Sequence, residues 1–167
     1  MTYIYTDSAK IVMKVLAPEV KRFSNKEKPY TVFAKGIKVF YFSEYPDTNS
    51  RIAANWAIRW MNDRIWEAKA NVIVKNTQGE ILYTEYLVWD EKKAIIYSNK
   101  FVKIVTGKDI ITGEGFTADQ AFNKWKISKV KGIITVNTPA ADTLKYLISM
   151  KSFQVKLNVF VDYTWLC

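Results

Sequence analysis

The sequence contains no histidine and only one cysteine, Cys167, among its 167 residues. A single thiol cannot form a disulfide within the chain, and the usual Cys and His ligands of zinc are missing. The absence of histidine also removes the commonest general acid and base, and with it Ser-His-Asp and Cys-His catalytic sets. We therefore expect no metal, no other cofactor and no enzyme, although a carboxylate pair of the glycosidase type stays open.

Long apolar runs are missing as well. No stretch of the sequence approaches the roughly 20 apolar residues that a membrane-spanning helix needs. The first residues, Met1 to Tyr5, have neither the basic start nor the apolar core of a signal peptide. As given, the chain is expected to be soluble.

Clustered charge of one sign is also scarce, although the net charge is +9. A positive balance favours anionic partners. The basic residues are scattered, however, and the pair Lys92-Lys93 directly follows Asp90-Glu91. Because no arginine-rich run and no motif of a nucleic-acid module is present, we expect no nucleic-acid partner.

The chain does contain a strand-like alternation that repeats. From Ile52 to Trp60, and again from Trp66 to Val74, every second residue is apolar, which is typical of a strand with one face in an apolar interior. The pattern returns 29 or 30 residues later, and a third, weaker copy surrounds Phe116. A hairpin of this kind cannot bury its apolar face alone, so the repeat predicts stacked antiparallel hairpins.

The parity of this repeat predicts which side chains point inward, with Arg59 and Lys69 on the opposite face. Whether the inward residues line an open apolar slot or fill a closed core stays open at this point. The predicted inward, lipid-binding positions are Ile58, Trp60, Trp66, Val72, Val74, Leu87, Trp89, Val102, Ile104 and Phe116.

Other segments complete the predicted order of elements. Strands are expected at 10–16 and 36–42, with a loop over 45–50, and Gly113-Glu114-Gly115 indicates a bulge or a close backbone approach and not a phosphate loop. After Pro139 the spacing predicts a short helix at 142–150 and then a strand at 153–165. This strand either pairs within the chain, which we favour, or is exchanged between two copies to give a dimer. We expect one domain over 1–137 and a C-terminal extension over 138–167 packed on it.

Several stretches resemble LptC, the periplasmic component of lipopolysaccharide export, and its Bacteroidetes-type members in particular. The resemblance covers about residues 6–132 and has structural and not catalytic motifs. Its main stretches are Tyr5-Thr6-Asp7-Ser8, Leu16-Ala17-Pro18-Glu19-Val20, Gly36-Ile37-Lys38-Val39, Ala53-Ala54-Asn55-Trp56-Ala57-Ile58, Ile65-Trp66-Glu67-Ala68, Leu82-Tyr83-Thr84-Glu85, Trp89-Asp90-Glu91-Lys92-Lys93 and Thr112-Gly113-Glu114-Gly115-Phe116.

The resemblance implies a twisted, open antiparallel β-jelly roll whose apolar interior holds the acyl chains of lipopolysaccharide. Such a protein receives them from an inner-membrane ABC transporter and passes them to an LptA-like periplasmic bridge protein joined by strand-edge pairing. It also implies an anchor to the inner membrane by an N-terminal segment missing from this chain. The alternatives are a non-catalytic β-sheet interaction scaffold and a glycan-binding module that uses exposed aromatic residues.

Overall fold

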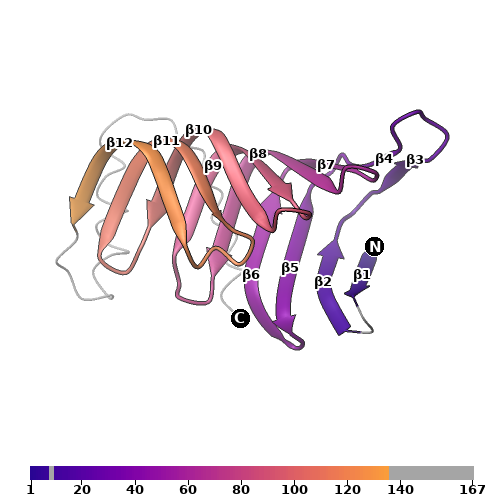
Figure 1. The fold of residues 1–167 in the computed structure, drawn as a ribbon, viewed down its shortest axis with the longest axis horizontal. Coiled ribbons are helices and arrows are strands. Elements are labelled where there is room, and N and C mark those ends of the chain that lie inside the picture. The colour runs from indigo at the N-terminus through magenta and orange to yellow at the C-terminus, as the bar shows by residue number, and fades with distance from the viewer. Residues whose placement is uncertain (8–9, 136–167) are drawn as a thin grey trace. The chain divides into compact units, whose positions relative to one another are not determined.

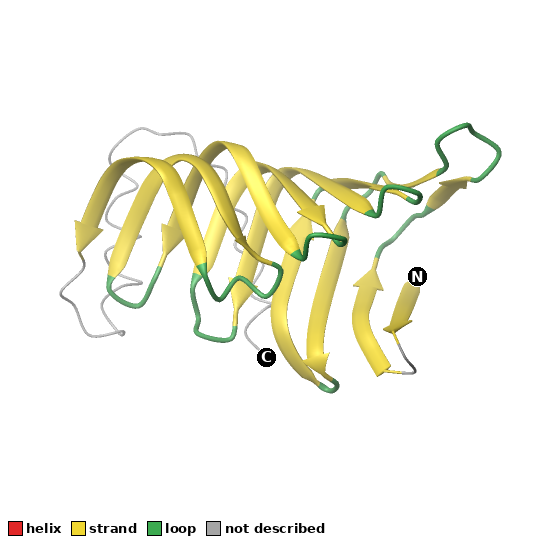
Figure 2. Cartoon of the chain, viewed as in Figure 1, coloured by secondary structure: helices red, strands yellow, loops and turns green. Residues whose placement is uncertain are grey.

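A computed structural model describes residues 1–7 and 10–135, all of which belong to one compact unit, Met1–Thr135. This unit is built from strands joined by turns and loops (Figure 2). The all-β, antiparallel fold predicted from the sequence is confirmed. The helix expected at 142–150 and the strand expected at 153–165 lie outside the described residues. The strands are β1 (Thr2–Asp7), β2 (Lys10–Leu16), β3 (Lys21–Phe23), β4 (Tyr30–Phe33), β5 (Ile37–Glu44), β6 (Asp47–Ala54), β7 (Trp56–Trp60), β8 (Ile65–Asn76), β9 (Ile81–Asp90), β10 (Ile95–Val105), β11 (Asp109–Asp119) and β12 (Trp125–Thr135).

The strands form one antiparallel sheet that forks at β8 (Figure 1). The main path runs β1-β2-β5-β6-β8-β9-β10-β11-β12, while β3, β4 and β7 form a side branch. The branch joins the first half of β8, where Trp60 of β7 pairs with Ile65. The main path joins the second half, where Ser50 of β6 pairs with Asn76. The fork therefore divides the N-terminal part of the unit into two groups of strands.

The long strands bend near their middles, so that the sheet folds back on itself. In β8 the backbone of Ala70 and Asn71 has positive φ angles of 61° and 51°, and the register with β9 shifts there. Strand β10 has a register shift after Ser98, and in β11 Gly115 has a φ of 74°. Such bulges bend a strand and increase its twist. Each long strand thus contributes one half to each of two facing layers, which gives the predicted twisted, open jelly roll.

The apolar core lies between these two layers. Phe33, Trp66 and Trp89 form a stacked row with ring centroids 5.6 and 6.1 Å apart and interplanar angles of 20°. Further along the sheet the interior combines aliphatic side chains, such as the completely buried Val102 and Ile104, with the buried rings of Phe116 and Phe122. One continuous cluster of buried side chains runs from β2 to β12.

The single strand predicted from Ile52 to Trp60 is wrong. The structure divides it at Asn55, whose backbone N–H donates to the carbonyl of Ala70 at 2.9 Å. Ala54 and Ala57 both belong to the core, three positions apart, so the parity of inward residues changes across the break. The loop predicted over 45–50 is also too long, because β6 already begins at Asp47.

Candidate functional site

Most of the predicted inward residues do meet between the two layers. Together with Ile37, Val39, Ile52 and Ala57, three of them line a small apolar cavity of about 20 Å³. The interior is therefore filled almost completely by the protein's own side chains. The predicted residues in the buried core are Trp66, Val72, Val74, Leu87, Trp89, Val102, Ile104 and Phe116.

The inward orientation predicted for Ile58 and Trp60 is wrong. Because of the break at Asn55, these side chains lie on the face opposite to Trp66, outside the core cluster. There Ile58 is still only 8% exposed, and Trp60 Nε1 donates to Glu67 at 2.8 Å. Arg59, predicted to face outward, instead lies toward the interior. Its guanidinium is 5.1 Å from the ring centroid of Tyr5 and 5.2 Å from that of Trp66.

The outer edges of the two layers approach each other, and we call these opposing edges the lips. They include Tyr5 and Tyr41 on one layer and Trp66 and Trp89 on the other. Near the N-terminal strands, the ring of Tyr5 meets Trp66 edge-on at 6.2 Å. The ring of Tyr41 meets Trp89 in the same way, also at 6.2 Å. Aromatic contacts thus close this part of the lips, and such edge-to-face pairs each contribute about 0.5–1.5 kcal/mol.

Hydrogen bonds close the lips nearer to β12. Here the turn between β11 and β12 crosses to the opposite layer, where Asn76 donates to the carbonyl of Phe122 at 2.7 Å. The side chain of Gln120 donates to the hydroxyl of Tyr41 at 2.6 Å, and Trp125 donates to Glu80 at 3.1 Å. We call this turn, residues 120–124, the latch, because its hydrogen bonds hold the two layers together.

Phe122 is the apolar part of this latch. Its side chain is completely buried, and its ring lies 5.8 Å from that of Phe116. Its backbone has a φ of 58°, unusual for a residue other than glycine. Sequence reasoning missed Phe122, although a phenylalanine within the polar turn Asp119 to Lys124 was a usable signal.

A charged cluster lies at the lip beside Trp66. Glu91, in the turn after β9, accepts from Arg59 Nε at 3.2 Å, from Arg64 Nε at 3.1 Å and from the indole N–H of Trp66. The side chains of Arg59 and Glu91 are only 17% and 11% exposed, whereas that of Arg64 is 58% exposed. Burial raises the pKa of the neighbouring Tyr5 hydroxyl, an effect that nearby Arg59 and Arg22 reduce.

Another polar group at the interior has no partner. The indole N–H of Trp89 is buried and finds no hydrogen-bond acceptor among the described residues. An unpaired buried donor costs about 1–3 kcal/mol. The next ring in the stacked row, Trp66, uses its own indole N–H to reach Glu91.

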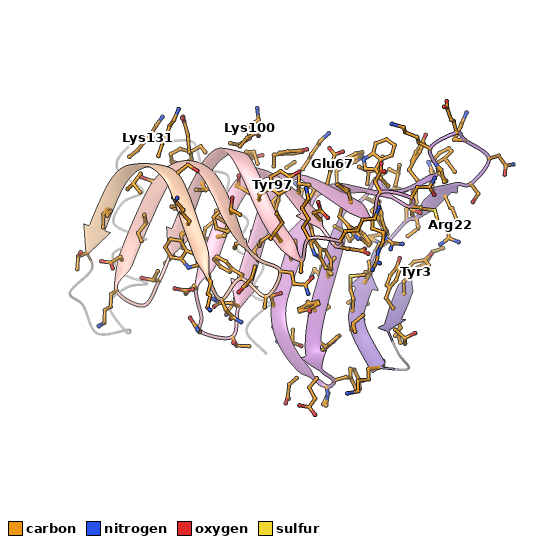
Figure 3. The ribbon with its side chains drawn as sticks, viewed as in Figure 1. Tyr3, Arg22, Glu67, Tyr97, Lys100 and Lys131 are labelled. Atoms are coloured by element: carbon orange, nitrogen blue, oxygen red, sulfur yellow. The ribbon has the colours of Figure 1, made fainter. Side chains whose placement is uncertain are left out.

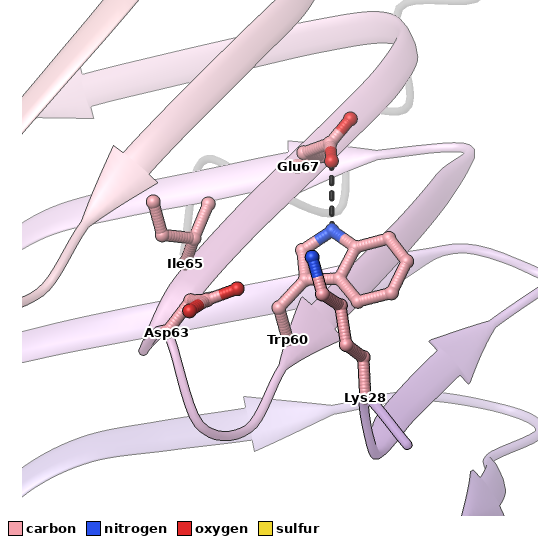
Figure 4. A pocket seen from close by; sticks show the side chains of 5 residues that line it. All are labelled: Lys28, Trp60, Asp63, Ile65 and Glu67. Atoms are coloured by element: carbon pink, nitrogen blue, oxygen red, sulfur yellow. Dashed lines mark hydrogen bonds between the residues drawn. The ribbon is translucent and has the colours of Figure 1, made fainter. Parts of the chain in front are cut away.

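The outer face carries a separate, shallow pocket of about 270 Å³ (Figure 4). The ring of Trp60 forms one wall, and Glu67 accepts hydrogen bonds there from Trp60 at 2.8 Å and from Tyr86 at 3.0 Å. Burial and the hydrogen bond to Glu67 raise the pKa of Tyr86 to about 12. The lining is completed by Lys28, Asp63 and Ile65.

The carboxylates that the sequence offered for catalysis have structural partners. Asp90 accepts from the backbone N–H of Lys93 at 3.0 Å, Glu85 accepts from that of Asn71 at 3.4 Å, and Glu91 pairs with arginines. Within residues 1–7 and 10–135, no group of three acidic or sulfur side chains could hold a metal ion. The same part of the chain contains no helix able to cross a bilayer.

Comparison with known proteins gives one family. The family model described as "Lipopolysaccharide-assembly, LptC-related" matches residues 1–135, the same range as the compact unit. No curated protein matches the chain.

Proposed function

The chain belongs to the LptC-related family of lipopolysaccharide-assembly proteins, and from this membership we propose that its interior holds lipid acyl chains during transport. The family has a role in lipopolysaccharide transport and is not a known enzyme family, and it suggests a periplasmic location. In this proposal the chain receives the acyl chains and passes them on, and no covalent bond is made or broken.

The observation that carries the proposal is the largely apolar interior between the two layers, in which Thr84 and Ser98 are buried polar exceptions. Its walls are side chains such as Val72, Val74, Leu87 and Val102, all at most 2% exposed. An acyl chain gains about 0.8 kcal/mol for each CH₂ group that leaves water. A slot of this composition therefore retains a saturated chain without needing a specific polar contact.

The lips must separate before acyl chains enter, because the apolar cavity beside Trp66 and Trp89 holds only about 20 Å³. The contacts that must open are two edge-to-face aromatic pairs, the contact of Arg59 with Tyr5, and the latch at Phe122. Each aromatic pair contributes about 0.5–1.5 kcal/mol, and the latch, with its hydrogen bonds and buried ring, contributes about 3–5 kcal/mol. Lipid burial over several CH₂ groups offsets that cost, so binding and opening are coupled.

Both ends of the main sheet path are suited to assembly with neighbours. No described strand pairs with the outer edge of β1 or of β12, and an open edge recruits a partner strand by backbone hydrogen bonds. We assign one edge to the inner-membrane ABC transporter and the other to an LptA-like bridge protein. The proposal also includes an N-terminal membrane anchor outside this chain.

Photo-crosslinking in cells tests the proposal, with two neighbouring positions as a matched pair. Leu87 belongs to the core and Val88, next to it, does not, although their exposed fractions are only 2% and 4%. A photoreactive residue at Leu87 should capture lipopolysaccharide, and one at Val88 should not. Equal capture at both positions would exclude the interior as the binding site.

The outer pocket supports a glycan-binding module as a second candidate. Aromatic faces flanked by acidic and basic groups are suited to sugar rings, and Trp60, Asp63 and Lys28 provide these groups here (Figure 4). A lipid-free oligosaccharide core should then protect Trp60 from chemical oxidation. Protection by the oligosaccharide without capture at Leu87 would favour this candidate over the lipid slot.

A further inference from the structure

The charged lip beside Trp66 has the properties of an anion site that the protein's own carboxylate occupies. Three side chains converge on Glu91: two arginines and one indole N–H. Two guanidinium groups face a single carboxylate, so one positive charge remains unneutralised, and Arg22 near Tyr5 adds another. We call Arg59, Arg64 and the indole N–H of Trp66 the cradle.

The cradle is held in position before any ligand arrives. The guanidinium of Arg59 lies 5.1 Å from the ring of Tyr5 on one layer and 5.2 Å from that of Trp66 on the other. Such contacts stabilise a cation over an aromatic face. A planar guanidinium fixed in this way presents its N–H groups in the forked geometry that suits a phosphate.

The place of the cradle in the fold indicates the kind of ligand. It adjoins the stacked rings of Trp66 and Trp89, at the lip where the apolar interior meets solvent. An amphiphile whose chains lie inside must leave its charged group at such a lip. The unpartnered indole N–H of Trp89 lies one ring further along the row, where the ester or amide carbonyl of an acyl chain could accept from it.

We propose that the cradle binds a phosphate monoester of the lipid headgroup, which replaces Glu91. This inference rests on the proposed function, because it assigns the headgroup of the lipid whose chains occupy the interior. A phosphate monoester carries a charge of about −1.5 to −2, whereas Glu91 supplies −1, so the exchange neutralises both guanidiniums. Glu91 lies one residue beyond the end of the β9–β10 pairing and is followed by the exposed residues Lys92 and Lys93, so its side chain, now 11% exposed, can turn into solvent without breaking strand pairing.

The test compares bisphosphorylated lipid A with chemically dephosphorylated lipid A, using capture by a photoreactive residue at Leu87. Arg64→Gln is the main variant, because the Arg64 side chain is 58% exposed and its replacement should disturb the packing little. It should reduce the preference for the phosphorylated lipid about tenfold, since charge-assisted hydrogen bonds are lost. Lys100→Gln, at the bend in β10 where the side chain points away from the sheet (Figure 3), removes the same charge elsewhere and should change nothing.

Glu91→Gln gives the opposite expectation. Removing the competing charge should strengthen capture of the bisphosphorylated lipid several-fold and leave the dephosphorylated lipid unaffected. A purely structural role for Glu91 predicts weaker capture of both lipids instead, and that result would overturn the proposal. A urea unfolding curve for each variant shows whether the fold is retained.

Inorganic phosphate alone forms the third arm and distinguishes a lipid headgroup from a free anion. If it shifts the indole N–H resonance of Trp66 at sub-millimolar concentration while both lipids are captured equally, the cradle binds free phosphate and the headgroup assignment is wrong. If the two lipids are captured equally and inorganic phosphate does not shift the Trp66 resonance, the headgroup inference is also refuted. The proposal that the interior holds acyl chains is then unaffected. If neither lipid is captured at Leu87, the proposed function itself fails, and the headgroup assignment fails with it.

Discussion

Truncation of Phe122 to alanine is the most direct test of the latch. The side chain is completely buried, and it comes from a turn and not from a strand. Its removal leaves a cavity between the layers beside Phe116, and such Phe→Ala changes cost about 3–5 kcal/mol. Loss of the edge-to-face pair with Phe116 accounts for about 0.5–1.5 kcal/mol of this cost.

The comparison of Phe122→Ala with Phe122→Gly separates packing from backbone strain. A φ of 58° strains the backbone of phenylalanine and of alanine to the same extent, whereas glycine adopts this conformation without strain. The hydrogen bond from Asn76 is made to the backbone carbonyl and survives both changes. Phe122→Gly should therefore be more stable than Phe122→Ala by about 1 kcal/mol.

Urea unfolding followed by tryptophan fluorescence measures these differences. Asn123→Ala, at the exposed next position of the same turn, is the matched control and should change the free energy of unfolding by less than about 0.5 kcal/mol. A loss below about 1 kcal/mol for Phe122→Ala, with an unchanged slope, would refute the role of Phe122 as the apolar part of the latch.

Three further predictions concern the bends, a close backbone approach and a titrating tyrosine. In urea unfolding, Gly113→Ala should destabilise by about 1–3 kcal/mol because a Cβ would overlap the carbonyl of Lys129, whereas Gly107→Ala has open space and should be neutral or slightly stabilising. By the same assay, Asn71→Val should cost about 1–2 kcal/mol because the φ of 51° strains a β-branched residue, and Asn71→Gly should not. The raised pKa of Tyr86 means that its neutral form stabilises the fold fully below about pH 10, and that this contribution is lost as the pH rises toward about 12. Wild type should therefore lose more stability over that range than Tyr86→Phe, and equal losses would contradict the assignment.

Period-two patterns predicted the strands well wherever the backbone is regular. The strand expected at 10–16 is β2, Lys10–Leu16, and the strand expected at 36–42 is β5, Ile37–Glu44. The close approach expected near Gly113 is confirmed, because no Cβ fits there. Local chemistry was sufficient at these positions, since each feature depends on a few adjacent residues.

The alternation of residues predicted the wrong face for side chains where the chain passes from one layer to the other. Asn55 is one irregular residue within an apparently continuous alternation, and it moved Ile58 and Trp60 to the outer face. The break depends on a hydrogen bond to Ala70, fifteen residues away, which no local pattern reveals. The cluster at Glu91 was missed for the same reason, because Arg59 and Glu91 are 32 residues apart in the sequence.

The run of bent strands from β8 to β12 sets the length of the apolar interior. Neighbouring strands lie about 4.8 Å apart, so each added hairpin lengthens the interior by roughly 10 Å without requiring a new core design. The recurrence of 29 or 30 residues is therefore a unit of length as well as a unit of folding. Duplication of one such segment would extend the apolar interior in a fixed step, and the number of hairpins in a related protein would report the length of its interior.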